Sequence, residues 1–287
     1  MRNRRDFTLI YVVGAGHSGS TLLSLLLNGH SRMVGLSELR ALDSLLGTSP
    51  RGSRRGDPVD ASVLATDVWR RVRARYERDT GRAFDQLSVH HPPFKVFRRW
   101  DRARIEAWAR PVRDLLEAIA VETRSDLLVD ASKAWQQLYL LRRSGLVRVK
   151  VLHALRDGRA VFHSYDRKYQ DVGFSLSHWV KPTLMSAVMR PLFDDADWMT
   201  VRYERLASDP AQTLADVCRF LGVEFEPGML RYRQASWIGI RGNRMSKRDD
   251  ETIRLDERWR ADLSWRKRLL FDLVGGPLNR YFGYRSF

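Results

Sequence analysis

A glycine-rich turn between an apolar run and a leucine-rich segment constrains the fold of this chain more than any other feature. The apolar run Phe7–Val13 is rich in β-forming residues, and residues 14–21 read Gly-Ala-Gly-His-Ser-Gly-Ser-Thr. Ser20–Asn28 then carries five leucines, which predicts a buried helix. A strand, a loop with four residues between Gly14 and Gly19, and a helix match a phosphate-binding loop, in which backbone N–H groups and the helix N-terminus hold an anion.

Further apolar runs alternate with segments of helical spacing along the chain. Strands are predicted at 33–36, 127–130, 147–155 and 198–202, and helices at 61–76, 102–122, 134–142, 159–168 and 210–221. This alternation predicts an α/β fold with a central, mainly parallel sheet flanked by helices. Since no composition shift marks a boundary, residues 1–287 are expected to form a single domain. Within it we expect a mobile loop at 47–60 and a C-terminal extension at 245–287 that packs on the core or forms a homodimer.

The composition favours anionic partners and excludes several classes of protein. Fifty Lys and Arg against 34 Asp and Glu give a net charge of +16, which favours anionic partners. The single cysteine, Cys218, excludes an internal disulfide and a Cys-rich zinc site. Two prolines follow His90 and His91 and break any helix that would present paired ligands, so no metal site is expected. No apolar run approaches the roughly 18 residues of a transmembrane helix, and we expect a cytoplasmic protein without a signal peptide.

The glycine-rich loop departs from that of nucleoside triphosphatases at one position. Ser20 stands where those proteins carry the lysine that contacts the terminal phosphates, which argues against hydrolysis of ATP or GTP. Two alternatives remain open at this point. A P-loop kinase-like phosphotransferase needs a replacement for this lysine. A basic nucleic-acid-binding protein needs clustered cations with interleaved aromatic residues, and residues 70–76 and 95–104, which come closest, are better explained as solvated helix faces.

The loop resembles the 5′-phosphosulfate loop of sulfotransferases, in a style closest to those acting on glycans or protein tyrosine. The resemblance implies a P-loop-like sulfotransferase fold and 3′-phosphoadenosine-5′-phosphosulfate (PAPS) as donor co-substrate, with no metal. The family loop usually begins with Lys or Arg, so His17 replaces a permanent cation by a group that is expected to act in its protonated form. The loop residues implied to bind PAPS are Gly16, His17, Ser18, Gly19, Ser20 and Thr21.

Three later segments resemble other nucleotide-binding motifs of this family. Arg156 and Ser164 have the separation of the Arg and Ser that bind the 3′-phosphate, and a guanidinium suits phosphate because it makes bidentate, charge-assisted contacts. Tyr203, in Tyr-Glu-Arg-Leu, corresponds to a residue near the adenine. A loop that closes over the nucleotide is implied at Arg241, Gly242, Asn243 and Arg244.

Sulfuryl transfer to a hydroxyl needs a base for the acceptor proton and cations for the leaving phosphate. By resemblance, Glu38 is the expected base, and Lys133, at the end of a predicted strand, faces the phosphosulfate bridge. His90 and His91 are the rival bases. We therefore interpret the chain as a sulfotransferase that uses Glu38, Lys133 and His17 in an in-line transfer to a hydroxyl of a small molecule, lipid, glycan or natural product. No nucleic-acid partner is expected, and aromatic and basic residues within 69–108 and 174–193 are expected to line the acceptor site.

Overall fold

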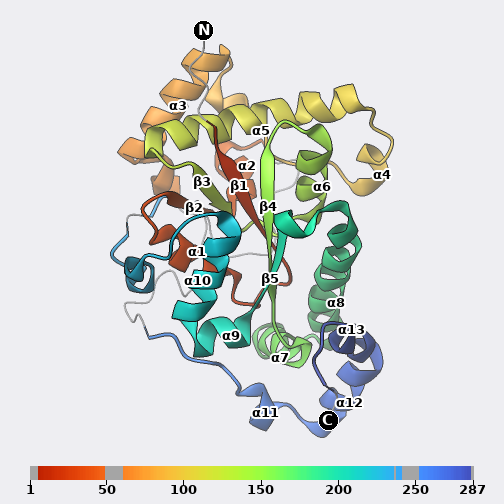
Figure 1. The fold of residues 1–287 in the computed structure, drawn as a ribbon. Helices are drawn as coiled ribbons and strands as arrows, with labels where there is room; N and C mark the ends of the chain where they lie inside the picture. The colour runs from red at the N-terminus through yellow and green to blue at the C-terminus, as the bar shows by residue number, and fades with distance from the viewer. Residues whose placement is uncertain (1–5, 49–60, 236, 241–251, 286–287) are drawn as a thin grey trace.

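One parallel sheet organises the fold. A computed structural model describes residues 6–48, 61–235, 237–240 and 252–285. Within these residues, five strands lie in the order β2-β3-β1-β4-β5, and each neighbouring pair is parallel (Figure 1). The strands are β1 (Thr8–Val13), β2 (Met33–Ser37), β3 (Leu127–Asp130), β4 (Arg148–Leu155) and β5 (Trp198–Arg202). The predicted α/β fold class, with its central parallel sheet, is thereby confirmed.

Helices cover both faces of this sheet and gather at the edge where its strands end. The α-helices are α1 (Ser20–Asn28), α2 (Leu42–Leu46), α3 (Asp67–Thr80), α4 (Phe94–Phe97), α5 (Arg102–Thr123), α6 (Trp135–Ser144), α7 (Gly158–Tyr169), α8 (Val172–Met189), α9 (Tyr203–Ser208), α10 (Pro210–Leu221), α11 (Trp259–Asp262), α12 (Trp265–Val274) and α13 (Gly276–Tyr281). The 3-10 helices are η1 (Leu39–Ala41), η2 (Ala61–Ala65), η3 (Phe84–Gln86), η4 (Arg190–Leu192), η5 (Asp195–Asp197) and η6 (Pro227–Arg231).

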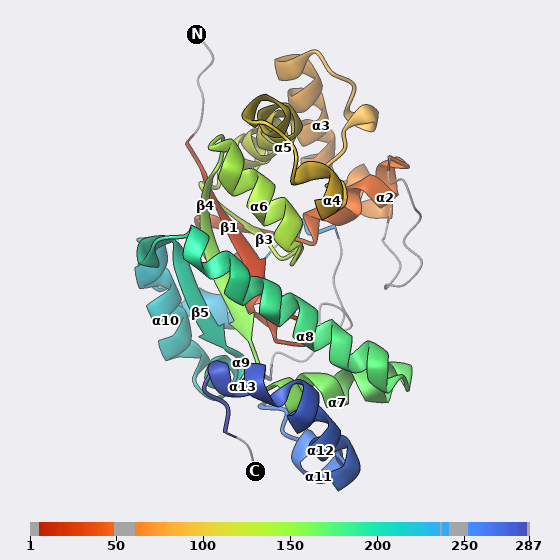
Figure 2. The same ribbon diagram turned by 90° about the vertical axis from the view of Figure 1, so that its right-hand side faces the viewer.

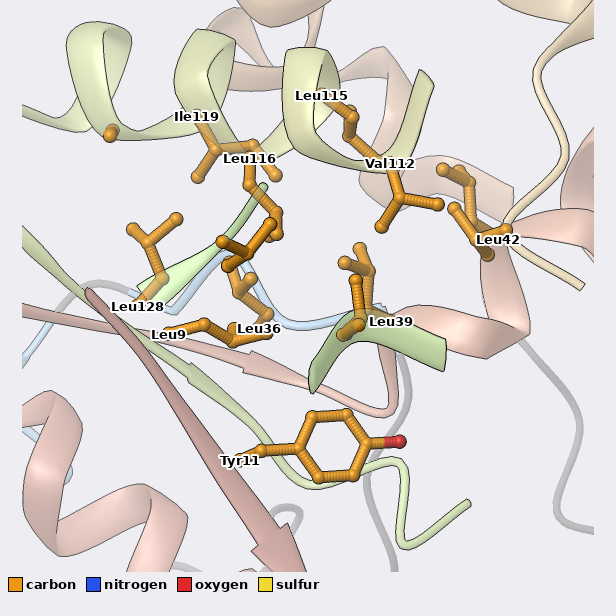
Figure 3. Close-up of a cluster of buried hydrophobic side chains, with 14 of the residues drawn as sticks. Leu9, Tyr11, Leu36, Leu39, Leu42, Val112, Leu115, Leu116, Ile119 and Leu128 are labelled. Atoms are coloured by element: carbon orange, nitrogen blue, oxygen red, sulfur yellow. The ribbon is translucent and has the colours of Figure 1, made fainter. Parts of the chain in front are cut away.

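Alternate residues of β1 belong to different layers of the core. Leu9 and Tyr11 pack with residues of α3, α5 and α6, whereas Ile10 and Val12 pack with residues of α1 and α10. Because both faces of the strand are covered, its sequence is continuously apolar, as is typical of parallel sheets. Figure 3 shows the first layer, in which α5 directs these side chains toward the sheet: Val112, Leu115, Leu116 and Ile119.

Some predicted elements differ from the structure, and several helices were not predicted, among them α8, α12 and α13. The helix predicted at 61–76 is divided into η2 and α3, because Thr66 adopts an extended conformation between them. Helix α8 was not predicted; it begins at the N-cap Asp171 and contains Pro182, which sequence rules treat as a helix breaker. Trp69 and Trp179, within segments expected to line the acceptor site, are instead fully buried in the core.

Three predicted segments lie wholly or partly outside the described residues. Of the loop at 47–60, the structure describes Gly47 and Thr48. The nucleotide loop predicted at 241–244 and the start of the 245–287 extension also lie outside the described residues. From residue 252 the chain follows the edge where the strands end and forms α11, α12 and α13 beside α7 and α8 (Figure 2). Phe271 is fully buried there, with ring centroids 5.9 Å from Phe162 and 5.2 Å from Trp179.

Helix length and polarity bear on whether a segment can cross a membrane. Helix α5, the longest of them, carries charged residues along its whole length. None of the helices in the described part of the chain is both long and apolar enough to cross a membrane.

Candidate active site

The turn between β1 and α1 forms a narrow cradle of backbone. Gly14, His17 and Gly19 have φ angles of 125°, 61° and 81°, in the left-handed region that favours glycine. A Cβ added at Gly16 would lie 2.1 Å from the Tyr165 hydroxyl, so only glycine fits there. Gly19 caps α1 without a side-chain hydrogen bond, and Ser20 and Thr21 form the first turn of the helix. The first N–H groups of α1 therefore lack intrahelical acceptors and suit an anion.

Two buried polar groups beside this cradle have no hydrogen-bond partner among the described residues. They are the Oγ of Ser18, a residue that is 2% exposed, and the Nε of Arg156, a residue that is 6% exposed. An unpaired buried donor costs about 1–3 kcal/mol. Such groups are therefore rare unless they have a function, and both can donate to a phosphate or sulfate oxygen.

His17 joins the cradle to the second predicted motif. Its Nδ1 lies 2.9 Å from the Oγ of Ser164, and its carbonyl oxygen accepts a 3.1 Å hydrogen bond from Arg156. Because β1 and β4 are neighbours in the sheet, the turns that follow these two strands meet at the same edge. The structure thus brings together residues predicted from segments 139 positions apart.

Arg156 and Tyr203 lie against each other beneath the segment that leads to α11. The guanidinium carbon lies 4.2 Å from the Tyr203 ring centroid, and the guanidinium donates to the Asp256 carbonyl at 2.6 Å. The Asp256 carboxylate is 3.6 Å from Arg156. Hydrogen bonds from Arg258, followed by the charge of Arg156, hold the pKa of Asp256 well below its ordinary value. Asp256 therefore balances the Arg156 cation at the position predicted to bind a 3′-phosphate.

Glu38 and Lys133, predicted separately, form a direct ion pair. Lys133 Nζ donates to Glu38 Oε1 at 2.8 Å and to the Ala131 carbonyl at 2.7 Å. Both side chains are partly accessible, at 23% for Glu38 and 17% for Lys133. Arg40 adds a second cation 3.8 Å from the Glu38 carboxylate. The pair forms because β2 and β3 are neighbours, so the turns that follow them lie side by side.

Asp130 connects these two turns, a role that sequence reasoning missed. Its Oδ1 accepts hydrogen bonds from the backbone N–H of Leu39 at 3.3 Å and from Ser132, through N–H at 2.8 Å and Oγ at 2.5 Å. Burial raises the pKa of Asp130 to about 6, although these hydrogen bonds and Lys133 oppose the change. A carboxylate at the end of the apolar run Leu-Leu-Val was the signal that could have identified it.

Tyr165 packs against the cradle, and no sequence signal pointed to it. Its ring lies edge-on to His17, with centroids 4.4 Å apart. Burial raises its pKa to about 12, and the charges of Tyr169 and Glu38 act in the same direction. The expected base and the cradle lie at the same edge of the sheet because β2, β3 and β1 are successive neighbours and parallel.

The rival bases lie on a separate segment between η3 and α4. The rings of His90 and His91 stack at 5.4 Å, and His91 Nδ1 lies 3.1 Å from the Pro92 carbonyl. Burial lowers the pKa of His91, and the positive charge of Arg40 acts in the same direction.

The turn after Arg156 is held by distant residues. Asp157 caps α7, and its N–H donates to Glu204 Oε1 at 2.9 Å. The Gly158 N–H donates to Asn279 Oδ1 at 2.9 Å, and a Cβ at Gly158 would lie 2.4 Å from the Phe271 ring. A proline at this position would lose that hydrogen bond, and its ring would clash with Phe271.

A parallel α/β sheet with a glycine-rich turn after its first strand, and with arginine- and lysine-bearing turns at the same edge, is typical of the class of proteins that bind phosphorylated ligands. The particular family follows from comparison with known proteins. A model of the sulfotransferase family matches residues 10–227, so the chain belongs to the sulfotransferase family and is a sulfotransferase enzyme. The predicted family is thereby confirmed.

Individual relatives agree with this assignment. Carbohydrate sulfotransferase 1 of Rattus norvegicus is 23% identical over 323 aligned positions, which cover 95% of this chain and 76% of the relative. The sulfotransferase domain of the Synechococcus PCC 7002 olefin synthase has a TM-score of 0.64 at 20% identity, covering 99% of this chain and 97% of that one. The sulfotransferase domain of the curacin biosynthetic pathway has a TM-score of 0.57 at 19% identity, covering 99% and 100%. Both structures support the fold.

Proposed function

We propose that this sulfotransferase uses PAPS as donor and transfers its sulfuryl group to a hydroxyl of an acceptor, with Glu38 as general base. The observation that carries the proposal is the 2.8 Å contact between Glu38 and Lys133. It joins a proton acceptor to a cation at the edge of the sheet where the glycine-rich cradle also lies, because β2, β3 and β1 are successive parallel neighbours. Proton removal and charge stabilisation are the two tasks that the reaction sets.

The residues of the cradle fit the anionic groups of PAPS. The proposal assigns the 5′-phosphosulfate to Gly16–Thr21 and the 3′-phosphate to Arg156 and Ser164. The unpartnered Ser18 Oγ and Arg156 Nε support this assignment, because both are donors beside a helix N-terminus. When bound, PAPS supplies an activated sulfuryl group. Tyr203 is proposed to lie near the adenine, the segment 241–244 to cover the nucleotide, and no metal is assigned.

The catalytic roles follow from charge and contact. Glu38 takes the proton from the hydroxyl of the acceptor substrate. An ionised carboxylate can do so because it accepts hydrogen bonds and donates none. Lys133 holds that carboxylate through its hydrogen bond and stabilises negative charge that develops on the leaving phosphate. Protonated His17 adds a second cation beside Ser164. The name of the rat relative makes carbohydrate hydroxyls the first acceptors to assay, with phenols, lipids and natural products following.

Ligand-dependent unfolding tests the donor without knowledge of the acceptor. A specific ligand at about 100-fold over its Kd adds about 2.7 kcal/mol of stability. The proposal expects 3′,5′-adenosine bisphosphate to raise the Tm more than ADP, which lacks the 3′-phosphate. A larger increase with Mg²⁺-ATP would contradict the proposal in favour of a P-loop phosphotransferase. No increase with any nucleotide, together with binding to DNA or RNA, would support the nucleic-acid alternative.

Substitution of the base tests the catalytic assignment separately. Glu38→Gln should keep the bisphosphate-dependent increase in Tm and lose about 10²–10⁴-fold in kcat, which is the usual contribution of a general base. Glu122→Gln is the matched control, because Glu122 also forms ion pairs with cations, Arg71 and Arg75, on α3. Unchanged turnover in Glu38→Gln would move the base to His90 or His91.

A further inference from the structure

Helix α12 carries apolar side chains on the side that faces away from the protein. Trp265, Leu269 and Leu273 are 69%, 54% and 70% exposed, and Leu270 and Val274 are 37% and 53% exposed. The first three follow one another at intervals of four residues, so they form one line along the helix, and the other two lie on the adjacent line. Figure 2 shows α12 at the outside of the molecule, next to α11 and α13.

The opposite side of α12 anchors the helix to the protein. Phe271 is fully buried against Trp179 of α8 and Phe162 of α7. Lys267 donates to Asp166 of α7 at 2.6 Å. The helix is therefore docked through Phe271 and Lys267, and its outward apolar residues are not needed to hold it in place. A surface helix of a soluble protein normally directs polar residues outward, so this reversed pattern requires a partner.

Cations lie beside the apolar side chains. Between Trp259 and Tyr281 the sequence has five Lys and Arg and two Asp, within a chain of net charge +16. Of these cations, Lys267 pairs with Asp166 on the anchoring side and Arg260 pairs with Glu257. Arg266 lies on the outward side with its guanidinium 5.5 Å from the Trp265 ring centroid. An apolar helix face that carries a tryptophan and is flanked by cations is typical of helices that lie in the interface of an anionic bilayer.

We infer that α12 docks this sulfotransferase onto an anionic lipid surface, with Trp265, Leu269 and Leu273 inserted among the headgroups. The helix would lie parallel to the membrane plane, and Arg266 beside Trp265 would contact lipid phosphates. Charge complementarity favours an anionic lipid surface over a second copy of the chain as the partner of this face. A symmetric dimer through the same face would bring two positively charged surfaces together. This inference is independent of the donor and acceptor proposed above.

Vesicle binding tests the inference directly. The full chain should sediment with vesicles that contain phosphatidylglycerol and bind vesicles of phosphatidylcholine alone at least about 10-fold more weakly, with the difference reduced by salt. The triple variant Trp265→Gln, Leu269→Gln, Leu273→Gln should bind phosphatidylglycerol vesicles at least about 10-fold more weakly than the wild-type chain. It should retain the wild-type circular dichroism spectrum, because Phe271 and its partners remain.

A matched control uses another exposed apolar line. Leu184, Val188 and Leu192 are 44%, 57% and 45% exposed on α8 and η4. Their simultaneous substitution by Gln should leave vesicle binding unchanged. Equal binding by the wild-type chain and the α12 variant, or no vesicle binding at all, would overturn the inference. So would a wild-type dimer, measured by light scattering, that the α12 variant converts to monomers, because a second copy would then cover the face.

Discussion

Asp130 provides a quantitative test of how burial and charge are balanced at the site. The residue is 1% exposed, and burial raises its pKa from an ordinary 3.8 to about 6. Because protonation is easier in the folded state than in the unfolded chain, the protonated carboxyl favours folding. This contribution is fully present below the unfolded pKa and is lost as pH rises through about 6. A tenfold change in a protonation equilibrium corresponds to about 1.4 kcal/mol, so the ionised carboxylate costs about 3 kcal/mol.

Asp130→Asn removes the charge and keeps an oxygen that can accept the hydrogen bonds of Leu39 and Ser132. At about pH 4 the unfolded carboxyl is already partly ionised, so the free energy of unfolding of the variant minus that of the wild-type chain should rise by about 2 kcal/mol between about pH 4 and about pH 8. Urea unfolding at a series of pH values measures this difference, in which groups common to both chains cancel. In a thermal scan the corresponding change in Tm is about 4 °C, at about 2 °C per kcal/mol.

Asp216 provides a control, because its substitution should change stability with pH in the opposite direction. Its hydrogen bond from Arg219 leads the interactions that lower its pKa, so its ionised form favours folding. The stability of Asp216→Asn relative to the wild-type chain should therefore fall as pH rises. If the difference for Asp130→Asn is constant with pH, burial does not dominate the pKa of Asp130. If it falls with pH, Lys133 and the hydrogen bonds outweigh burial, and the electrostatic account of the site is wrong.

Three further substitutions probe the donor site and the tail. Arg156→Ala should weaken binding of 3′,5′-adenosine bisphosphate by about 10–100-fold, the value of a charged hydrogen bond, and barely change binding of adenosine 5′-phosphosulfate; equal losses in calorimetry would exclude a dedicated 3′-phosphate contact. The activity of the wild-type chain should fall at alkaline pH as the His17 imidazolium loses its proton, and His17→Lys should keep activity there; the same alkaline loss in both chains would remove the proposed role. Phe271→Ala should lower the free energy of unfolding by about 3–5 kcal/mol, because it empties a fully buried site; a loss below about 1 kcal/mol in urea unfolding would show that the tail is not docked through this residue.

The sequence predicted the strands and those helices whose ends carry clear signals, but it did not predict every helix. Ser20–Asn28 and Pro210–Leu221 were predicted residue for residue, because apolar periodicity, Pro210 and Gly222 mark their ends. Helix α8 was missed because its apolar residues lie on several sides of the helix, and because Pro182 lies within it and is normally a helix-breaking signal in a sequence. The order of the strands was not predictable from local patterns, since it depends on which crossover lies on which face of the sheet.

Individual site residues were likewise easier to predict than their contacts. The family resemblance pointed to Glu38 and Lys133 one at a time, but their ion pair depends on the adjacency of β2 and β3. Tyr165 carries no local signal, because its position beside Gly16 follows only from the packing of α7 against the cradle. Asp256 could not be predicted as the partner of Arg156, since they are 100 residues apart and no local motif links them.

The hydrogen bond between Gly158 and Asn279 has a consequence for synthesis. The two residues are 121 positions apart, and ribosomes add about 5–20 residues per second, so about 6–24 s separate their emergence. A nascent chain therefore contains all five strands of the described sheet, which ends at Arg202, well before Asn279 can complete the turn after Arg156. The turn after Arg156 therefore reaches its final hydrogen bonding only after all five described strands have been synthesised.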